Sequence, residues 1–260
     1  MSDSNRTLYD EIKDFLEAER QVYGEFSVPE LKEIQREETT EEISDVAEEE
    51  KIRYEVSSTE PEVEKTTEDK LSSCSTLEEL RELCMQAEEL RTDLENTNLV
   101  FGLGNPKADL MLIGEAPGEQ EDIQGEPFVG AAGRLLNKIL SAIRFERSDV
   151  YIANILKHRP PGNRNPNPEE CKNSLPYLYR QIELIEPKII LCLGKISGNT
   201  IMGGENTLKS MRSKKHNFRE IELYVTYHPA ALLRNPQWKR PTWEDVQLVR
   251  KRYDELGGEP

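Results

Sequence analysis

Residues 109–136, DLMLIGEAPGEQEDIQGEPFVGAAGRLL, are the stretch that decides the fold. The stretch begins with a short apolar run, Asp109 to Ile113, that is typical of a buried strand. A Gly-Pro turn with four carboxylates follows, and then a glycine-rich loop around Phe128. From Ala131 to Ile143 the apolar residues recur at helical spacing, which predicts a helix. A strand, a tight loop and a helix in this order indicate one unit of an α/β domain.

The rest of the chain repeats the alternation of strands and helices. Apolar runs bounded by turn residues predict strands, and apolar residues at helical spacing predict helices. We expect strands at Val150–Leu156, Lys188–Leu193 and Glu220–Tyr227, and helices at 76–90, Pro168–Ile185 and Pro241–Leu256. This order predicts an α/β fold of three layers, α/β/α, with a mostly parallel central sheet of about four strands.

Three of the predicted strands lead into residues that can bind a ligand. The turn at Gly114, the amide of Asn154 and the imidazole of His228 each follow or end a predicted strand. The carboxyl ends of parallel strands meet at one rim of a sheet, and ligands of such folds bind there. We therefore expect these three residues to lie at one site.

The distribution of charge divides the chain into two parts. The net charge is −16, but residues 1–70 hold 23 of the 50 acidic residues and 9 of the 34 basic ones, so the remainder is close to neutral. We expect residues 1–74 to form an acidic, largely disordered extension with a short amphipathic helix at 7–23. Residues 75–257 should form the folded domain, with Ser75 as the first helix cap. The extension is a candidate surface for a protein partner, and the neutral domain can still concentrate positive charge around one cleft.

Composition also limits the compartment in which the protein works. No apolar run approaches the roughly 20 residues that a membrane span needs, and the first residues lack a signal pattern. The four cysteines, Cys74, Cys84, Cys171 and Cys192, include no CxxC pair and are expected to be reduced thiols. We expect a cytoplasmic protein that makes no membrane contact.

The motifs in residues 109–136 resemble those of the family 4 uracil-DNA glycosylases. The resemblance continues through residues 150–157, the Arg159-Pro160-Pro161 and Asn163-Arg164 segments, and residues 227–236. It covers roughly residues 76–255, and it implies a uracil-DNA glycosylase-like fold.

The resemblance also implies a role for each residue of the site. Glu115 and His228 would be catalytic: the carboxylate would stabilise the sugar cation or position water, and the histidine would donate to uracil O2. Glu121 would crowd the C5 edge of the base and exclude thymine. Phe128 would stack on the extruded uracil, and Asn154 would bond its Watson–Crick edge. The backbone of the turn, at Gly114 and Ala116, would face the base.

Contacts to DNA are expected from basic residues near the rim. The candidates are Lys157, Arg159, Arg164, Lys214, Lys215 and Arg234, and the densest basic stretch is Lys209–Lys215. Leu232 and Leu233 follow the His-Pro turn; we expect one of them to wedge into the base stack and the other to pack, and Leu232 is the candidate DNA contact. The resemblance implies that uracil-containing DNA is the partner and favours a monomer.

The chain departs from the family at the iron–sulfur ligands. The resemblance implies a four-iron–four-sulfur cluster held by four cysteines, but the corresponding positions are Ala87, Leu90, His158 and Cys171. Because a cluster needs thiolates or, more rarely, histidines at its irons, we predict no cluster, no metal and no other cofactor. Zinc held by Cys84, His158 and Cys171 is the open alternative. Ala230 is a second departure, since the family commonly has serine there.

The sequence supports three functions. The first is a monofunctional uracil-DNA glycosylase, which hydrolyses the N-glycosidic bond of uracil in DNA and starts base excision repair. The second is a catalytically reduced DNA- or partner-binding protein on the same fold, which the missing cluster and the acidic extension favour. The third is a glycosylase for another lesion, such as hypoxanthine. Retention of Glu115, Glu121, Phe128, Asn154 and His228 favours the first.

Overall fold

The computed structural model of the protein describes residues 66–258. The helix predicted at 7–23 lies outside the described residues. The described residues begin before the predicted domain boundary: α2 (Thr67–Ser73) is a capped helix with Leu71 buried. The folded domain therefore starts before residue 75. The predicted boundary is wrong by about the length of α2. The sequence pattern did not predict α2, because only one of its side chains, that of Leu71, is buried.

The central sheet has the four predicted strands, and these four run parallel to one another. They are β2 (Leu110–Gly114), β3 (Tyr151–Asn154), β4 (Ile189–Leu193) and β6 (Ile221–Thr226). Two short antiparallel strands, β1 (Leu103–Gly104) and β5 (His216–Phe218), extend the edges, so the order is β1-β3-β2-β4-β6-β5. The sheet thus has six strands rather than about four, because strands of two and three residues are too short to show an alternating pattern.

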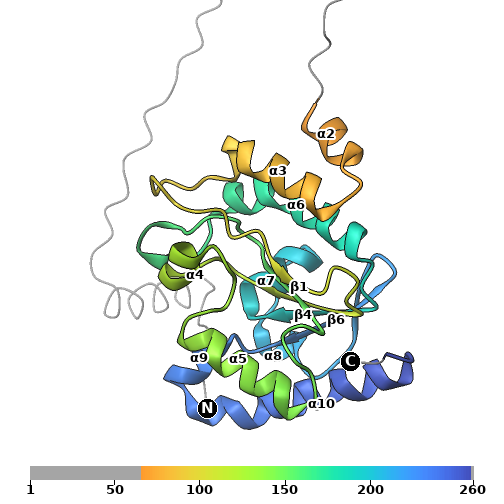
Figure 1. The fold of residues 1–260 in the computed structure, drawn as a ribbon. Helices are drawn as coiled ribbons and strands as arrows, with labels where there is room; N and C mark the ends of the chain where they lie inside the picture. Colours follow the sequence, from red (N-terminus) through yellow and green to blue (C-terminus); the bar gives the residue numbers. More distant parts are fainter. Residues whose placement is uncertain (1–65, 259–260) are drawn as a thin grey trace, which may run out of the picture. The chain divides into compact units, whose positions relative to one another are not determined.

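Helices cover both faces of the sheet, which confirms the three-layer fold (Figure 1). The predicted helices are α3 (Leu77–Gln86), α5 (Ala131–Ala142), α6 (Pro168–Ile185) and α10 (Lys239–Glu255). The helix expected at 76–90 ends earlier and continues as a single turn, η1 (Glu88–Leu90), and its cap is Thr76 rather than Ser75. Shorter elements were not predicted: α4 (Glu119–Gln124), α7 (Lys195–Met202), α8 (Leu208–Met211), α9 (Pro229–Arg234), η2 (Pro161–Asn163) and η3 (Pro236–Trp238).

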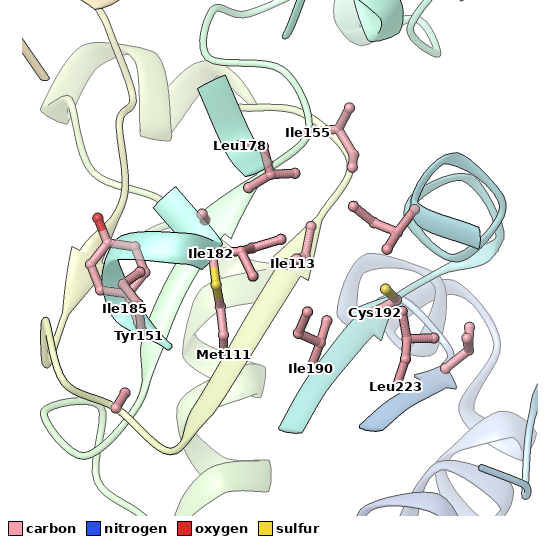
Figure 2. Close-up of a cluster of buried hydrophobic side chains, with 14 of the residues drawn as sticks. Met111, Ile113, Tyr151, Ile155, Leu178, Ile182, Ile185, Ile190, Cys192 and Leu223 are labelled. Carbon is pink, nitrogen blue, oxygen red and sulfur yellow. The ribbon is translucent and has the colours of Figure 1, made fainter. Parts of the chain in front are cut away.

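Alternate residues of the strands build two separate cores. Figure 2 shows one of them, in which Leu178 and Ile182 of α6 lie against Met111, Ile113 and Ile190 of the sheet. The intervening residues of the same strands point to the other face, where they pack against α5 and α10. Strands buried on both faces account for the continuous apolar runs in the sequence. They also make the sheet a rigid base for the loops at its carboxyl ends.

A third apolar cluster attaches the N-terminal helices to the outer side of α6. Leu80, Cys84, Ala87 and Leu90 are buried there against Tyr177. Polar contacts reinforce the packing, since Tyr177 Oη donates to Glu89 at 2.5 Å. Apolar side chains therefore dock this region on α6. In the described part of the chain, every helix is too short or too polar to cross a membrane.

Candidate active site

A cavity of about 380 Å³ lies beyond the carboxyl ends of β2, β3 and β6. Eight of the predicted site residues line it: Glu115, Ala116, Glu121, Phe128, Asn154, Arg164, His228 and Arg234. These residues come from separate stretches of the sequence. The rim that parallel strands share brings them together, as the sequence predicted for Gly114, Asn154 and His228.

The register of two strands positions the deepest part of the cavity. Gly114 is paired with Asn154 across β2 and β3, at the last residue of each strand. A Cβ at position 114 would lie 2.6 Å from Phe128 Cζ and would press still closer on Asn154 Oδ1. Gly114 is therefore the residue that lets the amide and the aromatic ring approach each other. Glycine is needed at position 114 because it has no side chain, and not because its backbone is flexible.

The amide of Asn154 has an unused acceptor inside the cavity. The residue is 1% exposed, and Oδ1 has no hydrogen-bond partner among the described residues. A buried oxygen without a partner costs free energy, on the order of 1–3 kcal/mol. Such a group is stable only if the rest of the fold fixes it, and a ligand that donates an N–H would satisfy it. Asn154 thus indicates a ligand with a donor next to an acceptor, since its own Nδ2 can donate.

Phe128 and His228 form one wall of the cavity. Their ring centroids are 5.5 Å apart with a tilt of 33°. Phe128 is buried but has a φ of 54°, which is rare for a bulky residue. Glu121 steadies this loop, because its Oε1 accepts hydrogen bonds from Val129 N at 3.0 Å and Gly130 N at 2.9 Å. An aromatic face held in this way is suited to stack on a planar ligand.

The imidazole of His228 is held as a neutral ring. His228 caps α9, and its Nδ1 accepts a hydrogen bond from Ala230 N at 3.2 Å. Burial, with Arg234 nearby, lowers the pKa of His228 to about 4. A neutral ring with an accepting Nδ1 carries its proton on Nε2. His228 therefore offers one N–H donor to a ligand in the cavity.

Glu115 lies beside the same cavity in a poorly solvated position. Burial raises the pKa of Glu115 to about 7. Its backbone continues the strand ladder, because Leu156 N donates to Glu115 O at 3.1 Å. A carboxyl with a raised pKa in a cleft is typical of active sites. The group changes charge near neutral pH, where His228 stays neutral.

Two predicted basic residues line the edge of the cavity, and a third lies next to it. Arg164 forms a bidentate ion pair with Glu170, at 2.8 and 2.7 Å, and lines the cavity together with Arg234. Arg159 Nε donates to Asn163 Oδ1 at 2.8 Å, and its guanidinium lies 3.9 Å from Glu119. Arg164 also donates to Asn165 O at 3.0 Å and to Asp93 Oδ2 at 3.2 Å, so its Nη groups are engaged and it can attract phosphate mainly through its charge.

Lys157 is not a surface residue, and the prediction of a DNA contact is wrong. The side chain is 0% exposed. Its Nζ donates to Asn154 O at 3.0 Å, to Phe101 O at 3.3 Å and to Gln181 Oε1 at 2.5 Å. Burial lowers the pKa of Lys157 to about 8. The lysine supports the backbone of Asn154 from below the site, which a sequence pattern of basic residues does not reveal.

The other predicted DNA contacts differ in whether they are exposed and in whether they lie near the cavity. Leu232 is 1% exposed while Leu233 is 47% exposed, so the choice of Leu232 as the DNA contact is wrong and Leu233 is the leucine at the surface. Lys214 and Lys215 are exposed beside β5, outside the cavity, and Lys215 pairs with Glu222 at 3.4 Å. Arg212 is bonded to the buried Asp245 at 2.7 Å. The densest basic stretch is therefore not part of this site.

Sequence reasoning missed several lining residues. Ala132, Pro160 and Asn165 also line the cavity. A wider hollow of about 980 Å³ between α6 and α7 shares Glu115, Asn165 and His228 with it, and Lys172 and Lys195 line that hollow. Lys195 comes just after the end of β4, so its place at a strand end could have identified it.

The residues present do not fit a four-iron–four-sulfur cluster. Ala87 and Leu90 stand at two of the four ligand positions and are buried in the third apolar cluster. His158 Nδ1 is within hydrogen-bond distance of Thr97 Oγ1, at 3.0 Å. Cys171 packs against a different core from Cys84. Within residues 66–258, no three His, Cys, Asp or Glu side chains are grouped to hold a metal.

Comparisons with known proteins give this geometry a family context. The family model of the uracil DNA glycosylase superfamily matches residues 101–247. A Type-4 uracil-DNA glycosylase of Archaeoglobus fulgidus is 42% identical over 170 residues, which are 62% of this chain and 83% of that protein. Those of Sulfurisphaera tokodaii and Pyrobaculum aerophilum are 43% and 40% identical over 184 and 180 residues, 67% and 66% of this chain and 84% and 92% of theirs.

Proposed function

Because this chain belongs to the uracil DNA glycosylase superfamily and resembles its Type-4 members, we propose that it is a uracil-DNA glycosylase. It hydrolyses the N-glycosidic bond of uracil in DNA and so starts base excision repair. The observation that carries the proposal is Oδ1 of Asn154, which has no hydrogen-bond partner among the described residues. It lies in a cavity walled by Phe128 and His228. We further propose a monofunctional, monomeric enzyme that works in the cytoplasm.

Asn154 selects uracil by the pattern of its imide edge. Its Oδ1 accepts the proton of uracil N3 and its Nδ2 donates to uracil O4. Cytosine has no proton on N3 and carries an amino group at position 4, so both bonds would fail and leave buried groups unpaired. A base in a duplex reaches this position only after it leaves the stack, and Phe128 then stacks on it.

His228 and Glu115 act on the two fragments of the bond that breaks. Negative charge develops on uracil as the bond lengthens, and the Nε2–H of His228 donates to O2 of the base. Positive charge develops on the sugar, and the carboxylate of Glu115 stabilises it or positions water. Because these charges exist mainly in the transition state, both groups accelerate the reaction more than they strengthen binding.

The DNA strand lies over the rim that holds the cavity. Arg164, Arg234 and Arg159 contact phosphates there, and Leu233 takes the place that the extruded uracil leaves in the stack. The wider hollow with Lys172 and Lys195 receives the neighbouring nucleotides. The supporting observation is that this hollow shares three residues with the uracil cavity.

The proposed activity is tested by abasic-site formation on an oligonucleotide that contains one uracil. We expect strand cleavage after alkali on the uracil strand, and none on matched strands with thymine or hypoxanthine. Cleavage before alkali would contradict the monofunctional mechanism. Excision of hypoxanthine at the rate of uracil would contradict the assignment of the base.

The pH dependence should report the carboxyl of Glu115. Its raised pKa, about 7, means that the stabilising carboxylate is lost as the pH falls through 7. We expect kcat/KM to fall about tenfold per pH unit below that value. Protonation of His228 should cause no further fall of kcat/KM down to about pH 5, because the pKa of His228 is about 4. The measurement is a profile of kcat/KM from about pH 5 to pH 9. The Glu115→Gln variant should have a low kcat/KM that does not change with pH. A fall of kcat/KM at acid pH that persists in this variant would contradict the assignment of the pH dependence to Glu115.

We also propose that the enzyme works without the iron–sulfur cluster. The supporting observation is that Ala87 and Leu90 are buried apolar residues at two ligand positions. We expect anaerobically purified protein to contain no stoichiometric iron or acid-labile sulfide, and chelators to leave uracil excision unchanged. Stoichiometric iron, together with loss of activity after its removal, would contradict this proposal.

A further inference from the structure

The backbone that carries the stacking ring is held in an unfavourable conformation. Phe128 has a φ of 54°, in the left-handed region that bulky residues rarely adopt. Such a conformation persists only where the surroundings determine it. Gly133 leaves the necessary room, because a Cβ there would collide with Phe128 O. The polar contacts that fix this loop therefore also fix the face of the ring.

Arg147 supplies two of these contacts from outside the motif. It lies between α5 and β3, is half-buried, and does not line the cavity. Its Nη1 donates to Phe128 O at 3.2 Å, and its Nη2 donates to Pro127 O. The guanidinium thus donates hydrogen bonds to two successive carbonyls. The next two N–H groups along the chain, of Val129 and Gly130, donate to Glu121. A planar fork with donors in fixed directions suits this arrangement, and a lysine could not reproduce it.

The hydrogen bonds of Arg147 go almost entirely to this loop. Its one further hydrogen bond among the described residues is to Asn137 Oδ1, at 3.4 Å. Burial lowers the pKa of Arg147, while Glu126 and Glu121 act in the opposite direction. A partly buried cation is unfavourable unless its hydrogen bonds are satisfied. The two carbonyls that satisfy them belong to the loop that presents Phe128.

We infer that Arg147 is a positioning residue that sets the stacking face of Phe128 through the carbonyls of Pro127 and Phe128. This inference rests on the proposed function, in which Phe128 stacks on the extruded uracil. Arg147 touches neither the base nor the sugar. Its removal should therefore weaken retention of the base without changing the chemistry of Glu115 and His228.

The expected result for Arg147→Met is a loss of about tenfold in kcat/KM and a similar rise in the inhibition constant of free uracil. Affinity for uracil-free DNA and the pH of the acid limb should not change. Arg147→Lys should be intermediate. The matched control is Arg250→Met, because Arg250 Nη1 also donates to two successive carbonyls, those of Ile143 and Arg144, but away from the cavity. That variant should change kcat/KM by less than about threefold.

A double-mutant cycle with Phe128→Ala distinguishes positioning from general stability. If Arg147 acts through the ring, Arg147→Met should have almost no further effect once the ring is gone. An equal loss in both backgrounds, or an unchanged inhibition constant for uracil, would overturn the inference. If Arg147→Met does not fold, the same cycle is run with Arg147→Lys. A wild-type enzyme that releases no uracil would instead count against the proposed function.

Discussion

His228→Ala is expected to lower kcat for uracil excision by about 10²–10³, with little change in KM. In the proposed mechanism the Nε2–H of His228 donates to uracil O2, and that bond strengthens as charge moves onto the base. Because Nδ1 is occupied by Ala230 N, the ring cannot present a different tautomer without losing its own cap. The measurement is single-turnover release of uracil over a range of enzyme concentrations, which gives the maximal rate and the half-saturation concentration without a contribution from product release.

The matched control for this variant is another histidine. His216 lies on β5, where Nε2 is within 2.8 Å of Met211 O, and it does not line the cavity. His216→Ala should leave the single-turnover rate within about threefold of wild type, because the ring lies outside the cavity. His228→Gln keeps an N–H donor and should recover part of the rate. A His228→Ala enzyme as fast as His216→Ala would contradict the role of His228.

Gly114→Ala should reduce kcat/KM by about 10² or more while the protein remains folded. The added Cβ would lie 2.6 Å from Phe128 Cζ and closer still to Asn154 Oδ1, so the ring and the amide must separate. Both groups contact the base in the proposed complex, and a displacement of about 1 Å is enough for an effect of this size. The backbone of β2 accepts alanine, since Gly114 does not have a positive φ.

The control for Gly114→Ala is the same substitution at Gly204. Gly204 lines the wider hollow but not the uracil cavity, and a Cβ there would meet only the end of the exposed Asn206 side chain, at 2.9 Å, which can move. Activity and thermal unfolding are measured on both variants. If Gly114→Ala keeps wild-type kcat/KM, the close approach of Phe128 and Asn154 is not what recognises uracil.

The sequence was sufficient for those parts of the fold and site that repeat a local pattern. Continuous apolar runs predicted the four long strands, and their ends predicted that Gly114, Asn154 and His228 would share one rim. The resemblance to the family supplied the chemical roles. The edge strands β1 and β5 could not be predicted, because they are held by their neighbours in the sheet and not by any periodicity of their own.

The errors concern side chains whose environment depends on distant residues. Lys157 looks like a DNA contact in a run of basic residues, but Phe101 and Gln181, which are far from it in sequence, enclose it. Leu232 and Leu233 are chemically equivalent in the sequence, and only the packing of α9 against α5 shows which one is buried. Arg147 carried no signal, since it belongs to no motif and acts on the backbone of another loop.

The N-terminal region shows how the domain is held where the family has its cluster. α3 and η1 dock on α6 through Leu80, Leu90 and Tyr177, with the hydrogen bond from Tyr177 to Glu89 at the edge. Arg180 adds two bonds to Cys74 O, at 3.1 and 2.6 Å, and so ties the segment between α2 and α3 to the same helix. Apolar burial of this kind needs no metal to form, which is the physical basis of the proposed cluster-free enzyme.

We propose that the cavity recognises the imide edge of uracil in DNA and that the enzyme releases that base. The most direct test quantifies the free base released from duplexes that differ only in one nucleotide: uracil, thymine or cytosine. We predict uracil release in equal amount to abasic sites, and loss of that release in Asn154→Ala. Cytosine should not be released because it lacks the imide pattern, and thymine should not be released because we propose that Glu121, which lines the cavity, excludes its C5 methyl group. No uracil release by the wild-type enzyme between about pH 7 and pH 9, where Glu115 is charged, would contradict this claim.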